Sequence, residues 1–428
     1  MGRNGYTGGA MRRMGRIGWA GLLAAGSAAT VLAGEPLSFR DGVARALAQS
    51  PYLAVSELDV AVQRLGEADA RSDFVPQFSL RTRYYLDPPA GSNERFQLSF
   101  TVDPYNPVEA GLSLDARKRL TDLAVLSHLQ AVAECLHRVG EGWLELEALS
   151  ELEAVEHEGL EWAGAAAADA SNRVARGLGA EPESEAAVRE LEIRRLRLDH
   201  VRRTRADVLE GLAALIGAPP TEPLIVDAKG AAAQVLGDPP GAGMAWETVR
   251  DRSIEAQVRE LRRKLQELRI LAARAAYIPD LWLGVSTPDP LSGFNDGDFY
   301  LSVGVDIPIW DGWKRARDIA RQKQELRRQD QSGLLDTLEF RSRWRAAESA
   351  CRAAEIDWRA AQAAEARADV RRRQAGEGEE ERRARAEWLE ARRRTLQAGL
   401  AWRKACLDRD ALSGALIDRL CKTETEQP

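Results

Sequence analysis

The side chains best suited to metal binding or covalent chemistry are few: the 428 residues include four histidines and four cysteines. His137 lies two residues after Cys135, but both fit a helical pattern, with Cys135 beside its apolar seam. His128, His157 and His200 stand on charged helical stretches without the spacing of zinc ligands. The sequence contains no nucleophile elbow and no phosphate-binding loop. We therefore expect no catalytic residue, no cofactor and no metal site.

Cys351 and Cys406 are the two cysteines whose spacing suggests a pair. Their midpoint falls beside Gly378, so they share one height if an antiparallel helical hairpin turns there. Both also lie on apolar helical stripes. A Cys351–Cys406 disulfide is one interpretation, a Cys135–Cys421 disulfide is another, and four buried thiols are the third. A bond requires Cα atoms within about 7 Å.

Acidic residues gather at two glycine-containing turns. Carboxylates stabilise the first turn of a helix through its dipole, which accounts for part of this pattern. The remainder suggests an acidic contact surface for a basic partner. These candidate contact residues are Gly177, Leu178, Gly179, Glu181, Gly376, Glu377, Gly378 and Glu379, with further glutamates at Glu183, Glu185, Glu380 and Glu381.

Composition and charge exclude two classes of protein. The formal net charge is −6 and 29% of residues are charged, which argues against bulk attraction to nucleic acid. No apolar run of 18 or more residues follows residue 33, which argues against a helical membrane protein.

The first 33 residues have the pattern of a secretory signal peptide. Four arginines and no acidic residue precede the apolar stretch 17–32, and Ala33 fits a cleavage site. We therefore expect export into a disulfide-permissive compartment.

The remaining chain repeats itself at an offset of 203 residues. Residues 96–103 and 299–306 agree at five of eight positions, and residues 74–80 align with 277–283 at the same offset. This similarity predicts a duplication. We expect a first repeat over 34–217, a linker over 218–243, a second repeat over 244–421 and a tail over 422–428.

Each repeat alternates between two periodicities. Segments at about 74–86, 95–103, 278–287 and 298–309 have a period of two, which predicts strands with one apolar and one polar face. Residues 108–176 and 314–374 have a period near 3.5, which predicts helices of roughly 100 and 90 Å. Each forms a hairpin with the helix that follows, with tips near 177–180 and 376–380. Four strands cannot close a barrel alone, so membrane-spanning strands require several chains.

The order of these elements resembles the TolC-type outer-membrane efflux proteins. Residues 305–315 are similar to the family's strand-to-helix junction, with Pro308, Asp311 and Gly312 at the matching positions. Pro76 and Pro279 are similar to its helix-to-strand junctions. The two glycine turns resemble its hairpin tips.

The resemblance implies a mainly α protein with a small β part. It implies a homotrimer with a twelve-stranded barrel, continued by an α-helical coiled-coil barrel in the periplasm. It implies an outer-membrane channel of a tripartite efflux or type I secretion system, working with a periplasmic adaptor protein and an inner-membrane pump, without catalysis or nucleic acid. The first strand-to-helix junction, residues 104–107, lacks the usual Asp-Gly, and the second tip is unusually charged. No aperture-closing residue is therefore transferred.

Two other functions are consistent with parts of the pattern. A periplasmic coiled-coil adaptor would have one hairpin flanked by β-rich domains, whereas this chain has two hairpins. An exported helical enzyme would need catalytic residues that the sequence does not provide. Extraction by detergent alone favours the channel, and extraction by buffer favours the adaptor or the enzyme.

Overall fold

The computed structural model describes residues 36–75, 78–84, 96–219, 224–237, 244–287, 300–307, 310–376 and 378–422. The expected signal peptide, Pro76, Pro308 and Glu377 lie outside these ranges, as does the side chain of Cys421. The described chain forms two compact units. The first comprises residues up to 54, residues 131–245 and residues from 344 onward, and the second comprises 55–130 and 246–343. Each unit draws on both expected repeats.

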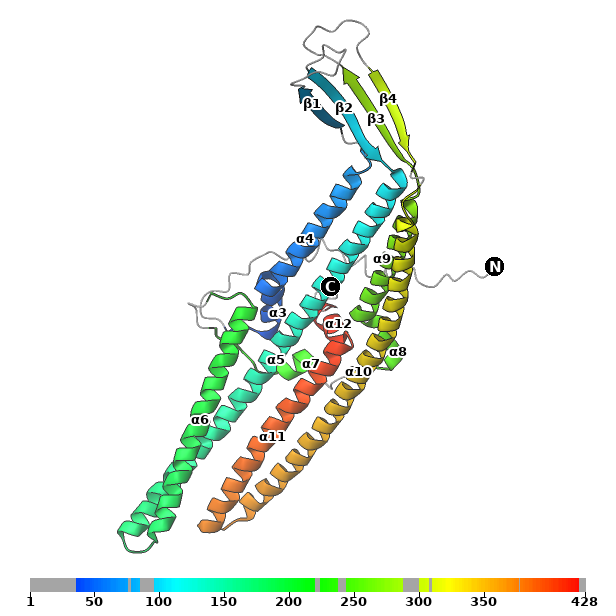
Figure 1. The fold of residues 1–428 in the computed structure, drawn as a ribbon. Coiled ribbons are helices and arrows are strands. Elements are labelled where there is room, and N and C mark those ends of the chain that lie inside the picture. Colours follow the sequence, from blue (N-terminus) through cyan, green and yellow to red (C-terminus); the bar gives the residue numbers. More distant parts are fainter. Residues whose placement is uncertain are drawn as a thin grey trace, which may run out of the picture. The chain divides into compact units, whose positions relative to one another are not determined.

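The two halves of the chain have the same order of elements (Figure 1). The first half contains α3 (Phe39–Gln49), α4 (Pro51–Ser72), β1 (Phe78–Tyr84), β2 (Phe96–Tyr105), α5 (Pro107–Ala175) and α6 (Glu181–Leu215). After α7 (Ala231–Leu236), the second contains α8 (Trp246–Arg252), α9 (Ile254–Ala275), β3 (Asp280–Thr287), β4 (Tyr300–Asp306), α10 (Lys314–Gln374), α11 (Glu379–Leu412) and α12 (Ala415–Lys422). Helices α4 and α9 each have 22 residues and begin 203 positions apart.

A buried serine separates the first two helices of each half. Ser50 lies between α3 and α4, and Ser253 lies between α8 and α9, at the same offset of 203. Pro51 begins α4, where the missing N–H costs nothing because the first turn has no intrahelical acceptor. The helix break is thus a shared feature of both halves.

The four strands form one antiparallel sheet in the order β1-β2-β3-β4 (Figure 1). Because antiparallel partners point to the same face, the register assigns whole rows of side chains to one side. One face carries an apolar row across all four strands: Leu80, Phe100, Val285 and Leu301. The other face carries small and polar residues, which include Ser79, Gly284 and Ser302.

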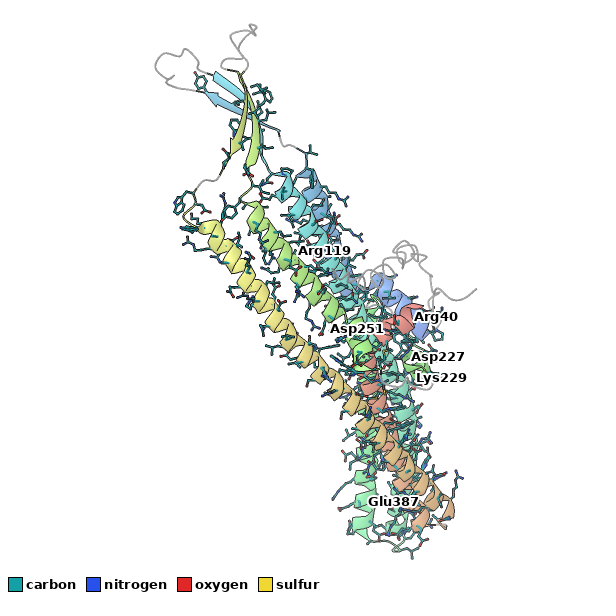
Figure 2. All side chains as sticks on the ribbon, turned by 90° about the vertical axis from the view of Figure 1, so that its right-hand side faces the viewer. Arg40, Arg119, Asp227, Lys229, Asp251 and Glu387 are labelled. Carbon is teal, nitrogen blue, oxygen red and sulfur yellow. The ribbon has the colours of Figure 1, made fainter. Side chains whose placement is uncertain are left out.

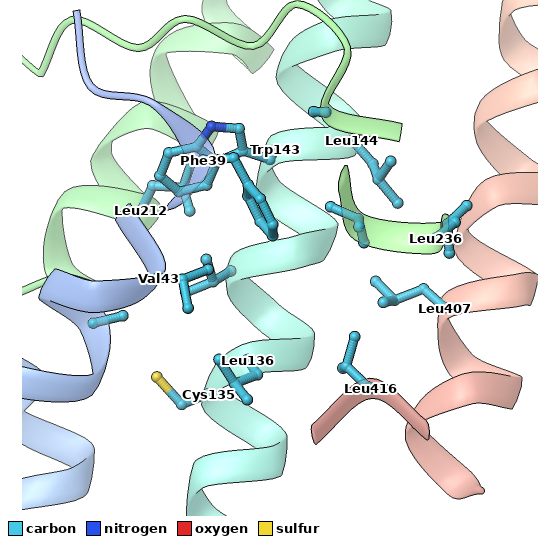
Figure 3. Close-up of a cluster of buried hydrophobic side chains, with 14 of the residues drawn as sticks. Phe39, Val43, Cys135, Leu136, Trp143, Leu144, Leu212, Leu236, Leu407 and Leu416 are labelled. Carbon is cyan, nitrogen blue, oxygen red and sulfur yellow. The ribbon is translucent and has the colours of Figure 1, made fainter. Parts of the chain in front are cut away.

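The main hydrophobic core lies in the first unit, around the middle of α5 (Figure 3). Trp143 of α5 is fully buried and packs edge-on against Phe39 of α3, with ring centroids 5.7 Å apart. Five further elements contribute to this core with the residues Leu212, Val235, Leu236, Cys351, Leu407 and Leu416. A helix as long as α5 gains most of its stability from such tertiary packing.

The segment 218–243, expected as a linker, also contributes to the core. Ala231, Val235 and Leu236 of α7 are buried, and Glu147 of α5 accepts hydrogen bonds from the backbone N–H groups of Gly230 and Ala232 at 3.1 and 3.0 Å.

Within the described ranges, no helix combines the length and apolarity needed to cross a membrane.

Gly42 of α3 is required by the close approach of Trp143. A Cβ atom at this position would lie 2.2 Å from the indole ring. We predict that Gly42→Ala lowers the free energy of unfolding by about 1–3 kcal/mol, because the core must shift to admit the methyl group. Thermal and urea unfolding in detergent measure the change.

Gly111→Ala in α5 is the matched control, because a Cβ atom there meets nothing within 4 Å. It should raise stability by up to about 1 kcal/mol through helix propensity. Equal effects of the two substitutions would contradict the packing around Trp143.

Candidate functional site

The first hairpin tip is closed by a Schellman motif at the end of α5. Gly177 has φ of +70°, and its N–H donates to the carbonyl of Val174 at 2.9 Å. The N–H of Leu178 donates to the carbonyl of Arg173 at 2.8 Å. This pattern requires a left-handed residue, which glycine adopts without steric cost. Leu178 then projects at the tip with 73% of its surface exposed.

The second tip uses its glycine on the other side of the turn. Helix α10 ends at Gln374, and Gly378 with φ of +108° precedes α11. The carbonyl of Gly378 accepts the first helical hydrogen bond, from the N–H of Arg382 at 3.2 Å. Gly376 has no positive φ in the structure. The two expected glycine pairs therefore differ: Gly177 ends a helix and Gly378 begins one.

The two tips lie beside each other, with mixed charge. Arg382 of α11 pairs with Asp169 of α5 at 2.9 Å. Glu387, labelled near the end of the second hairpin in Figure 2, pairs with Arg371 at 2.9 Å. Residues 369–387 contain six acidic and six basic residues, so the second tip has no net charge. Basic residues lie in the last turn of α10 and acidic residues in the first turn of α11, as the helix dipoles favour.

An open groove of about 520 Å³ lies between the two helices of the first tip. Its walls combine small, apolar and charged side chains of α5 and α6: Ser171, Val174, Ala175, Glu181, Ser184 and Val188. Glu181, one of the expected contact residues, lines this groove.

The strand-to-helix junction before α10 places Asp311 as a helix cap. A carboxylate oxygen of Asp311 accepts from the backbone N–H of Arg315 at 2.9 Å, and this hydrogen bond lowers the pKa of Asp311. Gly312 and Trp313 follow with φ of +65° and +67°. Two successive left-handed residues turn the chain into the helix, and the cap satisfies one of its first N–H groups.

Asn106 performs the capping role at the other strand-to-helix junction. Its side-chain oxygen accepts from the N–H groups of Val108 and Glu109 at 3.1 and 3.2 Å. Its amide also donates to the carbonyl of Ile278, next to the expected junction residue Pro279, at 3.5 Å. Asn106 was missed as a functional position because the Asp-Gly pattern is absent there. Asn before a proline at the first helical position is itself a capping signal.

Exposed aromatic side chains surround these junctions. Trp310 and Trp313 pack edge-on with ring centroids 5.6 Å apart, and 73% of the surface of Trp310 is exposed. Phe74 and Tyr277 at the helix-to-strand junctions are exposed as well, and the guanidinium of Arg315 lies over the Tyr277 ring. Aromatic residues of this kind are enriched at membrane interfaces.

The apolar face of the sheet has no cover within the described chain. Leu80, Phe100, Leu301 and Val303 are all exposed. On the opposite face, Trp282 covers Gly304, and the hydroxyl of Ser302 donates to the carbonyl of Gly284 at 3.1 Å. One face of the sheet is therefore apolar and exposed, and much of the other face is polar.

Ion pairs join α5 to α11 along the first unit. Acidic residues of α5 face basic residues of α11 in the pairs Asp169–Arg382, Glu158–Arg385, Glu156–Arg393, Glu147–Arg403 and Glu141–Lys404. Glu156 is the buried member of this series, with 1% of its side chain exposed. It lies 3.2 Å from Arg393 and 3.7 Å from Arg194 of α6, and so links three helices.

Cys351 of α10 and Cys406 of α11 face each other in the core. Their sulfur atoms lie 2.6 Å apart, and no bond joins them in this structure. Cys135 points from α5 toward α3 (Figure 3) and is not bonded to another cysteine there. Among the described residues, no group of three or more His, Cys, Asp or Glu side chains is placed to hold a metal ion.

No family model matches the sequence, and no curated protein matches it. Solved structures do match its fold. A membrane protein from Pseudomonas aeruginosa superposes with a TM-score of 0.72 at 16% identity, over 88% of this chain and 93% of the other. The CmeC outer membrane channel of Campylobacter jejuni gives 0.71 at 14% identity, over 88% and 85%. The MtrE outer membrane channel of Neisseria gonorrhoeae gives 0.65 at 17% identity, over 88% and 89%.

The chain therefore has the fold of these outer-membrane channels. The resemblance to TolC-type outer-membrane efflux proteins is confirmed at the level of the fold. The junction residues, the tip residues and the cysteine pair remain predictions about function.

We predict that Glu156→Gln destabilises the protein by about 1–3 kcal/mol. The substitution removes the buried carboxylate charge between Arg194 and Arg393, and leaves Arg194 paired only with Glu190 and Arg393 only with Glu390. Urea unfolding in detergent, followed by circular dichroism, measures the change.

Glu158→Gln is the matched control on the same helix. Its partner Arg385 and Glu158 itself are both partly exposed, so the loss should stay below about 1 kcal/mol. If the two variants lose equal stability, burial does not set the strength of these ion pairs.

Proposed function

We propose that this protein is an outer-membrane channel, a passive export duct that links the periplasm to the exterior. The observation that carries this proposal is the exposed apolar face of the sheet opposite a more polar face. A sheet with this division suits a barrel with lipid outside and water inside. The fold shared with outer-membrane channels supports the same conclusion.

The proposed duct is a homotrimer of duplicated chains. In the described chain, β1 and β4 each pair with one neighbour, so both edges of the sheet are available to other copies. Unpaired edges favour association, and three copies supply twelve strands, enough to enclose a lumen. The matching order of elements in the two halves supports the duplication.

Apolar stripes on two helices of the second unit support contact between copies. On α4 the residues Val55, Leu58, Val62 and Leu65 are exposed at steps of three and four. On α10 the exposed residues Leu334, Leu335 and Leu338 form a second stripe. Such seams are typical of helices that pack along a partner helix. Neighbouring copies of this chain are the proposed partners.

The hairpin tips are the proposed contact for a periplasmic adaptor protein, which connects the duct to an inner-membrane pump. Two features support this assignment: Leu178 projects at the first tip, and the groove between α5 and α6 combines apolar and charged walls. The adaptor alternative for this chain is disfavoured, because the chain has two hairpins and an exposed apolar sheet.

Purification and bilayer recording test the function directly. The full protein, extracted in detergent, should have the native mass of three chains and should give discrete conductance steps in planar lipid bilayers. A monomer that buffer alone releases from cells would overturn the proposal.

We predict different effects of arginine on the two faces of β4. Val303→Arg should cost about 2–4 kcal/mol near the bilayer midplane, because it places a charge in lipid. Ser302→Arg should cost much less, because it places the charge in the lumen. The yield of folded trimer in the outer membrane and its urea unfolding in vesicles provide the comparison. Equal tolerance at these adjacent positions would reject lipid contact.

We predict that reversing Glu379, Glu380 and Glu381 to Lys weakens adaptor binding and slows export. The trimer should persist, because these side chains begin α11 and belong neither to the sheet edges nor to the apolar stripes of α4 and α10 that are the proposed contacts between copies. Photo-crosslinking from position 178 in cells reports the adaptor contact, and native mass reports the trimer.

The control for this variant carries the same charge change away from the tips. Glu134, Glu151 and Glu161 of α5 are exposed and suit this purpose. Unchanged crosslinking in the tip variant would reject adaptor contact by these glutamates. Stabilisation of the first turn of α11 would then be their remaining role.

A further inference from the structure

The closest pair of sulfur atoms in the described chain belongs to Cys351 and Cys406. The atoms are 2.6 Å apart, and a disulfide bond has a length of about 2.05 Å, so bonding needs a movement of about half an ångström. The two residues lie on α10 and α11, and they are 4% and 1% exposed. Both helices carry their cysteine on the side that faces the shared core.

We propose that Cys351 and Cys406 form a structural disulfide that fastens α10 to α11 in the exported protein. This inference rests on the proposed function for its compartment, since disulfides persist in exported proteins and not in a reducing cytosol. The pairing itself rests only on the geometry of the two helices.

The bond requires an oxidant, and a protein disulfide of the exported compartment supplies it by exchange. One thiolate of the pair attacks the oxidant's disulfide and displaces one of its sulfurs as a thiolate. The second cysteine then attacks the mixed disulfide. The two thiols lose two protons and two electrons, and the oxidant's disulfide becomes a dithiol.

The surroundings of the pair indicate when this exchange occurs. Burial raises the pKa of the Cys406 thiol, which disfavours the reactive thiolate in the packed hairpin. The guanidinium of Arg409, which pairs with Asp410, lies 3.8 Å from the sulfur of Cys351 and helps to enclose the pair. Oxidation therefore takes place while the hairpin is still open, and the finished bond is shielded from reductants.

Neighbouring contacts hold the two helices at the spacing that the bond needs. Closer to the tip, Trp358 of α10 stacks on Trp402 of α11 with ring centroids 4.4 Å apart and an angle of 9°. Gly399 lets the edge of Trp358 approach α11 closely. Cys135 points toward α3, away from this seam, and does not compete for either sulfur (Figure 3).

Non-reducing peptide mapping of the full exported chain tests the proposal. Thiols are blocked with N-ethylmaleimide as the cells are lysed, the protein is purified without reductant, and its peptides are identified by mass. We expect one pair of peptides joined through Cys351 and Cys406, lighter by two hydrogen atoms than the reduced pair. In the chain-entropy model, a loop of this length shifts the unfolding equilibrium about a thousandfold, so the oxidised protein should resist urea better than the reduced protein.

Matched variants assign the bond. Cys351→Ser should make Cys406 available to maleimide after unfolding, whereas Cys135→Ser should leave the joined peptides unchanged. Blocked Cys351 and Cys406 in protein recovered from the outer membrane would overturn the disulfide while leaving the channel function intact.

A chain recovered outside the outer membrane would instead overturn the proposed function. Refolding of that chain with oxidised glutathione then decides the pairing. A Cys351–Cys406 bond as the product supports it, and any other product overturns it.

Discussion

A helix of 69 residues cannot bury its apolar side chains by itself, and the rest of the structure depends on this constraint. Helix α5 extends for about 100 Å, and its stability depends on partners that cover its apolar seam along that length. In the first unit those partners are α3, α6, α7 and α11, which meet around Trp143. Two glycines of α5 and α3 permit this close packing: a Cβ on Gly142 would lie 2.7 Å from Leu212, and Gly42 admits the Trp143 ring.

Charge pairing complements the apolar seam where the helices leave the core. Toward the hairpin ends, a smaller apolar cluster that includes Val155 of α5 and Leu389 of α11 is accompanied by ion pairs, most of which are partly exposed. Exposed pairs contribute little stability individually, yet their geometry fixes which residues lie opposite each other. Glu153 of α5 accepts hydrogen bonds from Arg202 and Arg205 of α6, both at 2.9 Å. These bonds, the one from Arg202 first, lower the pKa of Glu153. Charged side chains that remain partly in contact with water thus hold the hairpins in register.

Much of this architecture could be predicted from local sequence patterns. The helix expected over 108–176 and α5 differ by one residue at each end, and the helix expected over 314–374 coincides with α10. Periodicity and glycine turns are local signals, so they locate helices and tips well. The capping role of Asn106, the burial of α7 and the pairing of Glu156 with two arginines could not be predicted, because each depends on residues distant in the sequence. The division into two compact units, each built from parts of both expected repeats, could not be predicted for the same reason.

The mixed charge of the second tip determines how a partner would find it. Six acidic and six basic residues cancel, so the tip produces little field beyond the Debye length of about 8 Å at physiological ionic strength. Long-range steering, which accelerates the encounter of oppositely charged proteins, is therefore weak here. A partner would reach this tip at an ordinary diffusional rate and would be selected at contact, by whether its own charges match the successive blocks of arginines and glutamates. Salt in the surrounding medium would then change the lifetime of such a complex more than the rate at which it forms.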